Sequence, residues 1–448
     1  MPETSLLEAQ LDILVVDDSP TYRMILSRVL RGWPRANLVG TAGDGMAALA
    51  VIQEKHPHLV LLDVSMPVLD GIETMRRIRQ NHADVDVIML SGLDAGQTGL
   101  TMQALSLGAL DFVPKPQGDN PTESFSALAL SLFPLLDLAA ARHRRRQSRL
   151  EAAKSTLPPV LVHRASTRPE MPKPIGPGAN PPMPVPAPVV HAAPAPAPVP
   201  ASDSMFHAPH HVVAPPEQKL SAPARTEPRR PSPAPAAVPA KPIAASSRKI
   251  PQRIELVAIG VSTGGPNALH AMVPHIPADF PVPIVCVQHM PPLFTASLAE
   301  RLDRESKLKV VEGVEGAILE AGVLYIAPGG FHMVIARAAD GRLRLSMRTD
   351  PPVHSCRPSV DVLFRSVAEV ASGPVLSVVL TGMGSDGADG VVALRAKGAW
   401  SIIQDEPTSV VWGMPGAVHA AGQADEILPL ESIAARLTEI VSRKGGRP

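Results

Sequence analysis

The stretch "IELVAIGVSTGGPNALHAM", residues 254–272, predicts a buried strand, a tight turn and a helix in immediate succession. The apolar run ends at Ser262, two glycines follow, and the helix is expected to begin near Pro266, because proline suits the first turn of a helix. Gly260, Ser262 and Gly264 also spell G-x-S-x-G, a pattern that exposes a serine on a sharp turn beside backbone N–H groups. Ser262 is therefore a candidate nucleophile, and its alternative role is that of a helix N-cap.

The same alternation of strand and helix extends to both sides of this stretch. After residue 250 the further strands are "VPIVCVQHM", "VLYIAPGG", "VLSVVLTGMG" and "WSIIQDE", and before residue 135 they are "DILVVDD", "ANLVGTAG", "HLVLLDV", "DVIMLSG" and "LDFVPKP". Alternating strands and helices predict parallel sheets covered by helices on both faces. We expect a five-stranded, doubly wound α/β domain at residues 1–135 and a second, larger, mainly parallel α/β domain at residues 251–445.

Residues 136–250 are expected to be a linker. Of the 51 prolines in the chain, 25 lie between residues 151 and 250, many alternating with alanine as in "PMPVPAPVVHAAPAPAPVPA". Proline removes backbone donors, and the scarcity of large apolar residues leaves nothing to build a core, so the segment is predicted to be disordered with polyproline II character. A docking site for a proline-recognising partner is the alternative.

Composition narrows the class of protein. The 42 basic and 42 acidic residues balance, and the dense basic run at 142–149, "RHRRRQSR", is expected to be a solvated helix end, so no nucleic-acid partner is predicted. Two cysteines, Cys286 and Cys356, do not make a disulfide framework. The N-terminus lacks an apolar leader core, and the longest apolar stretch, residues 127–141, contains Pro134 and an aspartate and is shorter than a membrane span. We therefore expect a cytoplasmic protein without membrane insertion.

Polar residues follow the strands of the first domain. Because the carboxyl ends of parallel strands meet at one edge of a sheet, they are expected to converge there; they are Asp17, Asp18, Asp63, Ser91 and Lys115. Three carboxylates suit Mg²⁺, and Asp63 is a candidate nucleophile toward phosphorus, with the charge of the resulting acyl phosphate balanced by the metal and Lys115. Any one of these residues alone would more simply be a turn or cap residue.

These residues resemble a known family. The segments "VVDDS", "LLDVSMPVLDGI", "MLSG" and "DFVPKP" are similar to the receiver domain of two-component response regulators. The resemblance implies phosphorylation of Asp63 by a histidine kinase, Mg²⁺ held with Asp17 and Asp18, Ser91 as the switch hydroxyl, and a cis peptide between Lys115 and Pro116.

A serine nucleophile needs a base and a group that orients the base. His289 directly follows a buried strand and is expected at the same edge as Ser262, whereas the other histidines considered are assigned structural roles; these are His270, His275 and His419. The third group lies in "VVLTGMGSDGADG", residues 378–390. Its glycines match G-x-G-x-x-G, with Asp405 at the spacing of a dinucleotide site, but Asp386 would oppose a pyrophosphate and would complete a Ser–His–Asp triad.

The second domain also resembles a family. The segments "IGVSTGGP", "QHMPPLFTASLAERL", "YIAPGGFHM", "RPSVDVLFRSVA", "LTGMGSDGADG" and "VWGMPGAV" are similar to the CheB-type chemotaxis protein-glutamate methylesterase domain. The resemblance implies that Ser262, His289 and Asp386 hydrolyse glutamate γ-methyl esters, and deamidate glutamines, on chemoreceptors without a cofactor. Backbone N–H groups near Thr263 and Met383 are the candidate oxyanion donors.

The resemblance further implies regulation and location. The unphosphorylated receiver would block the esterase site, phosphorylation by a chemotaxis-type kinase would relieve the block, and the enzyme would be recruited to receptor clusters. His332 and Arg357 are left with two alternatives, a part in the substrate groove or a core or capping role. A nicotinamide-dependent enzyme and a non-catalytic scaffold remain the competing classes of function.

Overall fold

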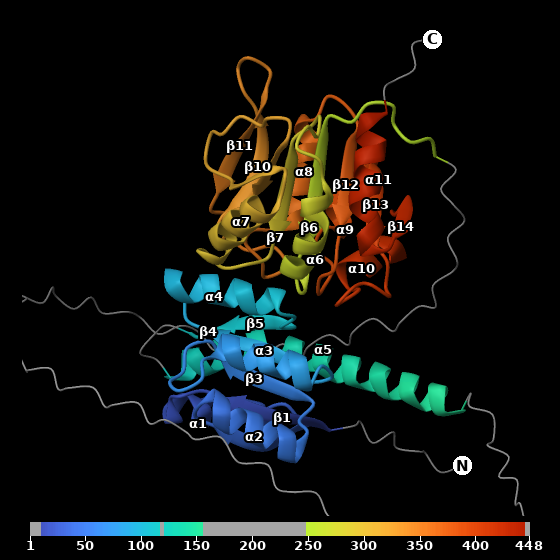
Figure 1. The fold of residues 1–448 in the computed structure, drawn as a ribbon. Helices are drawn as coiled ribbons and strands as arrows, with labels where there is room; N and C mark the ends of the chain where they lie inside the picture. Colours follow the sequence, from blue (N-terminus) through green and yellow to red (C-terminus); the bar gives the residue numbers. More distant parts are fainter. Residues whose placement is uncertain (1–9, 117–120, 156–247, 444–448) are drawn as a thin grey trace, which may run out of the picture. The chain divides into compact units, whose positions relative to one another are not determined.

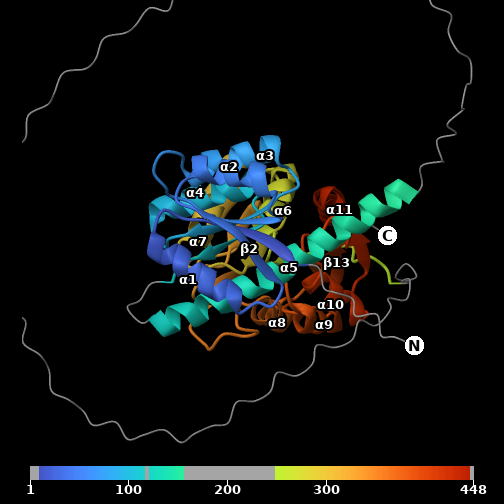
Figure 2. The same ribbon diagram turned by 90° about the horizontal axis from the view of Figure 1, so that it is seen from below.

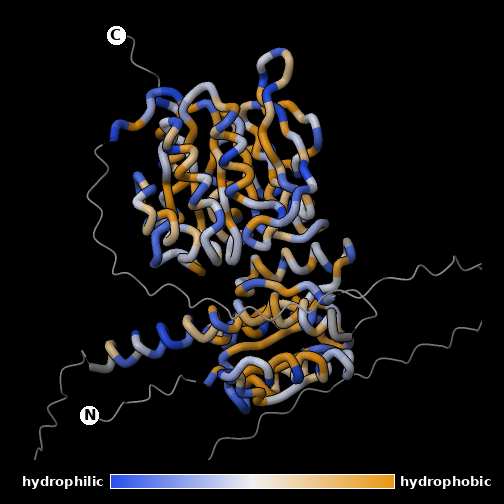
Figure 3. Tube along the Cα trace, turned by 180° about the vertical axis from the view of Figure 1, so that it is seen from behind, coloured by the Kyte–Doolittle hydropathy of each residue, from blue (hydrophilic) through white to orange (hydrophobic). Residues whose placement is uncertain are grey.

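The computed structural model describes residues 10–116, 121–155 and 248–443. They form two α/β domains, an N-terminal one that ends with helix α5 and a C-terminal one that begins with strand β6 (Figure 1). In each domain the strands carry the most hydrophobic residues (Figure 3). Residues 156–247, which make up most of the predicted linker, lie outside the described residues.

The N-terminal sheet has the predicted five parallel strands, in the order β2-β1-β3-β4-β5. The strands are β1 (Leu11–Val16), β2 (Ala36–Ala42), β3 (Leu59–Asp63), β4 (Asp86–Ser91) and β5 (Asp111–Pro114). Strands β3 and β4 are buried at every residue, as expected for parallel strands covered on both faces. The direction of chain progression reverses between β1 and β3, which is where open α/β sheets bind their ligands.

Helices cover both faces of this sheet, with α1 and α5 on one side and α2, α3 and α4 on the other (Figure 2). The helices are α1 (Pro20–Arg31), α2 (Gly45–Lys55), α3 (Gly71–Asn81), α4 (Ala95–Ser106) and α5 (Pro121–Ser155). The first four each begin after a residue whose side chain accepts a hydrogen bond from the first turn; these N-caps are Ser19, Asp44, Asp70 and Asp94. Local capping chemistry therefore sets where these helices start.

Helix α5 continues beyond residue 135 to Ser155 and contains the basic run. Its segment Ser124–Arg149 is long and apolar enough to cross a membrane by length and composition, which differs from the sequence expectation because the helix extends on both sides of the apolar stretch. Core helices of other proteins pass the same test. Leu128, Leu132 and Leu136 of α5 are at most 1 % exposed and belong to the apolar core of this domain, so packing on the sheet accounts for the apolar face of α5.

The C-terminal sheet has seven strands, all paired in parallel, in the order β14-β13-β12-β6-β7-β9-β8. They are β6 (Leu256–Val261), β7 (Ile284–Gln288), β8 (Lys309–Glu312), β9 (Val323–Ile326), β12 (Val375–Val379), β13 (Trp400–Gln404) and β14 (Glu426–Leu428). The five predicted strands are all present. The two strands that the sequence does not predict, β8 and β14, lie at the sheet edges, and their short runs with charged residues give little periodic signal.

A two-stranded antiparallel ribbon, β10 (His332–Arg337) and β11 (Leu343–Arg348), accompanies the sheet and was also not predicted. The helices of this domain are α6 (Gly265–Met272), the 3-10 helix η1 (Val273–His275), α7 (Phe294–Glu305), α8 (Val360–Val370), α9 (Ala388–Ala396), α10 (Met414–Ala420) and α11 (Leu430–Ser442). One apolar cluster joins α6, α7 and α11 to the sheet, and a second joins α8, α9, α10 and the ribbon to its other face. Strand β6 sits at the reversal of chain progression, between β12 and β7.

Candidate active site

Ser262 follows β6 at the carboxyl edge of the C-terminal sheet. Its backbone N–H donates to the carbonyl oxygen of Thr381 at 3.0 Å, so the pairing of β6 with β12 extends to the serine itself. Gly264 then takes a left-handed conformation (φ 75°), and a Cβ atom there would lie 2.6 Å from Val410. The turn that exposes Ser262 therefore requires glycine for both its conformation and its packing.

Gln288, the last residue of β7, supports this turn from beneath. Its side-chain Nε2 donates to the carbonyl oxygens of Ser262 and His289, at 3.0 and 3.2 Å. A Cβ atom at position 265 would lie 1.9 Å from the Gln288 side-chain oxygen, so Gly265 is the residue that admits this buried amide. Gln288 was not predicted as a site residue, because a glutamine at a strand end carries no distinctive pattern.

His289 joins Ser262 to Asp386. The hydroxyl of Ser262 lies 3.0 Å from His289 Nδ1, and His289 Nε2 lies 2.8 Å from Asp386 Oδ2. The three residues follow β6, β7 and β12, which are neighbours in the sheet, and this places residues far apart in sequence at one edge. The ring nitrogens thus have the opposite assignment from the serine-protease triad, in which Nε2 faces the serine.

Asp386 lies in the glycine-rich loop between β12 and α9. A Cβ atom on Gly382 would lie 2.9 Å from the Cβ of Ser262, so the loop passes the serine at a distance that only glycine permits. Gly384 (φ 81°) and Gly387 (φ 95°) both take left-handed conformations. The three glycines of the G-x-G-x-x-G pattern therefore place a carboxylate beside His289.

The Asp386 carboxylate is buried, 2 % exposed, and accepts four hydrogen bonds. Besides His289, the donors are the hydroxyl of Ser359 and the N–H of Asp361 to Oδ1, both at 2.9 Å, and the N–H of Val360 to Oδ2 at 2.8 Å. Burial opposes the charge of Asp386, but these donors outweigh burial and lower its pKa. Asp386 is therefore held as an anion.

The same contacts favour the protonated form of His289. Burial alone would lower the pKa of His289, but the hydrogen bond to Asp386 and the nearby thiol of Cys356 outweigh it and raise that pKa to about 9. An imidazole with a raised pKa is a strong proton acceptor for a serine hydroxyl. The arrangement suits a base that removes a proton from Ser262.

The dinucleotide alternative is not supported by this loop. A pyrophosphate would have to approach glycine N–H groups beside a buried carboxylate, and Asp405, which would bind the ribose, instead accepts a hydrogen bond from the N–H of Thr408. Asp386 already accepts hydrogen bonds from both sides. The negative charge of Asp386 and the hydrogen bonds that its oxygens already accept therefore oppose the binding of a nucleotide to this loop.

The candidate oxyanion donors lie in the turns next to the triad. Thr263 follows the nucleophile, and the carbonyl of Ser262, which shares a peptide plane with the Thr263 N–H, accepts a hydrogen bond from Gln288 Nε2. Among the described residues, no acceptor is found for the backbone N–H of Thr263 or Met383. Both N–H groups thus retain the donor capacity that the prediction requires, and their role stays a prediction.

Other predicted residues have structural contacts. His332 is fully buried in β10, where its Nε2 donates to the carbonyl of Pro351 and its Nδ1 accepts from the N–H of Ser359 at 3.2 Å. Arg357 donates to the carbonyls of Thr349 and Asp350. Of the two alternatives left open for these residues, the contacts favour support of the backbone.

Two further histidines and one cysteine of this domain have contacts within the fold. His270 pairs with Glu305, and the ring of His419 lies 5.3 Å from that of Trp412, in keeping with structural roles. Cys286 is buried in β7, where burial raises the pKa of its thiol. No disulfide joins the two cysteines, both of which are described.

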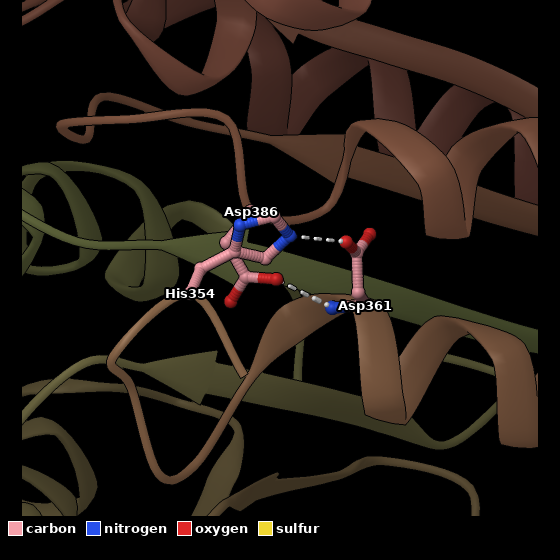
Figure 4. Close-up of side chains that lie close together, drawn as sticks. All are labelled: His354, Asp361 and Asp386. Carbon is pink, nitrogen blue, oxygen red and sulfur yellow. Dashed lines mark hydrogen bonds and ion pairs between the residues drawn. The ribbon is translucent and has the colours of Figure 1, made fainter. Parts of the chain in front are cut away.

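His354, Asp361 and Asp386 lie close enough together to suggest a metal site. Figure 4 shows His354 pointing at the Asp361 carboxylate, while the backbone of Asp361 points at Asp386. A carboxylate oxygen has about two lone-pair sites, and each oxygen of Asp386 already accepts two hydrogen bonds. The donors present fill the coordination positions of Asp386, so this cluster does not fit a cation.

A second cluster lies at the carboxyl edge of the N-terminal sheet. The carboxylates of Asp17, Asp18 and Asp63 offer oxygen atoms within 4.8 Å of one another. Lys115 Nζ lies 2.8 Å from Asp17 Oδ2 and 2.9 Å from Asp63 Oδ1. Burial raises the pKa of Asp63 to about 6, with Asp17 and Asp18 adding to the effect and Lys115 opposing it. An all-oxygen donor set whose charges repel one another fits Mg²⁺.

Two residues near this cluster were not predicted. The hydroxyl oxygens of Thr101, on α4, and of Ser91 lie 2.6 Å apart, so the predicted switch hydroxyl is bonded to that helix. Lys115 Nζ lies 4.7 Å from the centre of the Tyr22 ring.

The expected cis peptide between Lys115 and Pro116 is wrong. Within the described ranges the one cis peptide precedes Pro358, and Lys115 reaches both Asp17 and Asp63 with a trans bond.

Comparison with known proteins gives two family matches. Residues 13–123 match the response regulator receiver domain, and residues 257–437 match the CheB methylesterase domain. A protein-glutamate methylesterase/protein-glutamine glutaminase of Trichodesmium erythraeum is 36% identical over 434 residues, which cover 97% of this chain and 99% of that protein. Proteins of the same name from Desulfotalea psychrophila (36%, 96% and 98% covered) and Maricaulis maris (38%, 96% and 95% covered) are similar over the same extent.

Proposed function

Since this chain belongs to the family of the protein-glutamate methylesterase/protein-glutamine glutaminases, we propose that Ser262, His289 and Asp386 carry out its hydrolytic reaction. The enzyme hydrolyses glutamate γ-methyl esters and deamidates glutamine side chains of chemoreceptors. Its receiver domain makes it a response regulator, activated by phosphorylation in chemotaxis adaptation.

The reaction begins at the hydroxyl of Ser262. His289 Nδ1, 3.0 Å away, takes the hydroxyl proton as the serine oxygen attacks the ester carbonyl. The tetrahedral oxyanion is stabilised by the N–H groups of Thr263 and Met383, and His289 then returns the proton to the departing methoxide, which leaves as methanol. Water hydrolyses the glutamyl-serine ester by the same steps, giving a glutamate side chain and free Ser262. With glutamine the leaving group is ammonia.

Asp386 keeps His289 in the working tautomer. Because its carboxylate accepts the proton on Nε2, the lone pair of Nδ1 faces the serine. The negative charge of Asp386 also stabilises the imidazolium that forms as Ser262 loses its proton. One observation carries this proposal: three side chains from three neighbouring strand ends form an unbroken series of hydrogen bonds.

Replacing the nucleophile tests the proposal. In the full-length protein, Ser262→Ala is expected to lower receptor demethylation by about 10³-fold or more and to abolish labelling by a serine-directed fluorophosphonate. Ser432→Ala, on the exposed first turn of α11, is the matched control and is expected to keep both. Demethylation at the wild-type rate by Ser262→Ala would refute the assignment.

Asp63 is assigned as the phosphoryl acceptor of the receiver domain. A Mg²⁺ ion held by Asp17, Asp18 and Asp63 would neutralise charge on the phosphoryl group during its transfer. Lys115 contacts Asp63 directly and would pair with the acyl phosphate. Ser91, at the end of β4, is assigned as the hydroxyl that follows the new phosphoryl oxygen, for which it would leave Thr101.

The partners follow from the two domains. A chemotaxis-type histidine kinase supplies the phosphoryl group, and methyl-accepting chemoreceptors supply the substrate side chains. We place the enzyme in the cytoplasm, at clusters of the receptors that it would demethylate. No nucleic acid is part of this proposal.

A further inference from the structure

Helix α8 presents its N-terminus to the acid of the proposed triad. The N–H groups of Val360 and Asp361 and the hydroxyl of Ser359 all donate to Asp386. These are first-turn donors that have no partner inside the helix, and the positive end of the helix dipole favours an anion at this position. Asp386 is thereby the capping anion of a helix that lies far from it in sequence.

The side chain of Asp361 makes the reverse contact. Its Oδ1 accepts hydrogen bonds from the N–H of Gly387 at 3.0 Å and of Gly390 at 2.6 Å, at the start of α9. Its Oδ2 accepts from Nε2 of His354 at 3.1 Å (Figure 4). Asp361 is 1 % exposed, so these are buried contacts. The backbone of Asp361 thus holds Asp386, while its side chain holds the loop that carries Asp386.

The packing between the two segments leaves little freedom for this contact. A Cβ atom on Gly387 would lie 2.8 Å from Val360 Cγ1, and one on Gly390 would lie 2.6 Å from Phe364 Cβ. The loop and α8 therefore meet at backbone distance, and a shift of one displaces the other.

Holding two carboxylates side by side in this packing has an electrostatic cost. Burial, with the charge of Asp386 adding to it, raises the pKa of Asp361, and the donors from Gly390 and His354 oppose that effect. Closing α8 onto α9 does not by itself require a second buried charge, so packing alone does not account for Asp361.

We propose that Asp361 is a positioning residue for the hydrolytic reaction, fixing Asp386 against His289 by bonding the loop on which Asp386 lies. This inference rests on the proposed function of the triad. Asp361 touches neither substrate nor reacting atoms, and it acts through Asp386 alone. Its loss is expected to let Asp386 turn away from His289.

Two substitutions separate positioning from mere support of the fold. Asp361→Ala is expected to lower kcat for receptor demethylation about 10- to 100-fold with little change in KM, because a misplaced catalytic group costs rate rather than binding. The acid limb of its kcat/KM profile should move to lower pH, since a displaced Asp386 no longer favours the imidazolium of His289. Asp361→Asn keeps an acceptor oxygen for Gly387 and Gly390, and should stay within about threefold of wild type.

Asp389→Asn is the matched control. This carboxylate lies in the first turn of α9, is 71% exposed and pairs with Arg365, so it should change neither kcat nor the pH profile. Asp386→Asn is measured in parallel. If Asp386→Asn has wild-type activity, the proposed triad is wrong; if it is inactive while Asp361→Ala shows wild-type kcat and pH profile, only the role of Asp361 is wrong.

A third variant covers the case in which Asp361→Ala does not fold. Asp361→Glu keeps a carboxylate but moves it by one methylene relative to the N–H groups of Gly387 and Gly390, so it disturbs the bonds to the loop without removing the charge. An NMR titration of His289 in this variant should show its pKa shifted toward lower values. A folded Asp361→Glu protein in which His289 titrates as in wild type would overturn the inference.

Discussion

Two carboxylates stand at similar places in this chain, Asp63 at the end of β3 and Asp386 in the loop after β12, and each strand lies beside the reversal in its sheet, yet their surroundings differ. Asp386 accepts four hydrogen bonds and has a lowered pKa. Asp63 meets the ammonium of Lys115 and the carboxylates of Asp17 and Asp18, and its pKa is raised to about 6. One carboxylate is stabilised as an anion by the fold, and the other is not.

The difference matches the two kinds of chemistry that we propose for these carboxylates. A residue that only orients a base must keep one position and one charge through the reaction, and preorganised donors provide this. A residue that itself accepts a phosphoryl group must leave an oxygen free to react, and its charge is balanced when a cation binds. The carboxyl edge of the C-terminal sheet is therefore preorganised around Asp386. At the carboxyl edge of the N-terminal sheet, the charge of Asp63 is balanced only when a cation binds.

Removal of Mg²⁺ is expected to give the largest difference in behaviour between the two sheet edges. With a small phosphodonor such as acetyl phosphate, chelation should abolish phosphorylation of Asp63 and the accompanying rise in esterase activity, because three neighbouring carboxylates repel an incoming phosphoryl group without a cation. Basal esterase activity should be unchanged. Phosphoryl incorporation and methanol release, measured in the same samples, test this.

Asp63→Asn is the control for that experiment, because it removes the phosphoryl acceptor while Asp17 and Asp18 remain. It should abolish the response to the phosphodonor at any Mg²⁺ concentration and leave basal activity as in wild type. A fall in basal activity on chelation would contradict the distinction between the two edges.

The pH dependence of the esterase is the next largest effect. His289 must be neutral to accept the serine proton, and its pKa is raised to about 9, so kcat/KM should fall about tenfold per pH unit below that value. In Asp386→Asn the acid limb of the residual kcat/KM should move toward about 6.5, the ordinary histidine value, because the favourable charge is lost. The profile of kcat/KM between pH 5 and 10 measures both.

The same shift has a consequence of opposite sign for stability. Because the folded-state pKa of His289 exceeds its unfolded value, its pairing with Asp386 contributes stability that is complete below about pH 6.5 and is lost as pH rises through about 9. Activity should therefore increase over the range in which this contribution decreases. If the acid limb of the kcat/KM profile stayed in place in Asp386→Asn, the carboxylate of Asp386 would not be what sets the pKa of His289.

The smallest predicted effect concerns the amide beneath the triad. Gln288→Met keeps the length of the side chain but removes the donor to the carbonyls of Ser262 and His289. The free energy of unfolding should fall by about 1–3 kcal/mol, the cost of leaving buried acceptors without a partner. Urea denaturation measures this, with Gln423→Met, whose amide bonds Ala421 at the surface, as the control. Equal losses in the two variants would show that the buried amide has no special role.

The convergence of the proposed catalytic residues was predictable because each lies beyond the end of a strand. Ser262 and His289 come directly after apolar runs, Asp386 lies in the loop that follows another, and parallel strands bring such positions to one edge. The same logic located Asp63 and its neighbours. The five strands of each sheet that the apolar pattern predicts are all present.

The supporting residues were not predictable in the same way. Asp361 lies inside a helix whose own pattern explains only its apolar face, and its contact with Gly387 depends on how α8 packs against the loop. Thr101 reaches Ser91 from the middle of α4 for the same reason. Contacts that arise from packing between elements leave no local periodic signal.

The position of β6 between β7 and β12 also determines when catalysis becomes possible during synthesis. When Ser262 and His289 have been synthesised, β12, which pairs with the side of β6 opposite β7, has not yet been made, and neither has the loop after β12. A nascent chain that ends before Asp386 thus lacks the acid of the triad and the strand that positions it. With the proposed triad, the enzyme gains hydrolytic activity only after its receiver domain, which is translated first, has been completed.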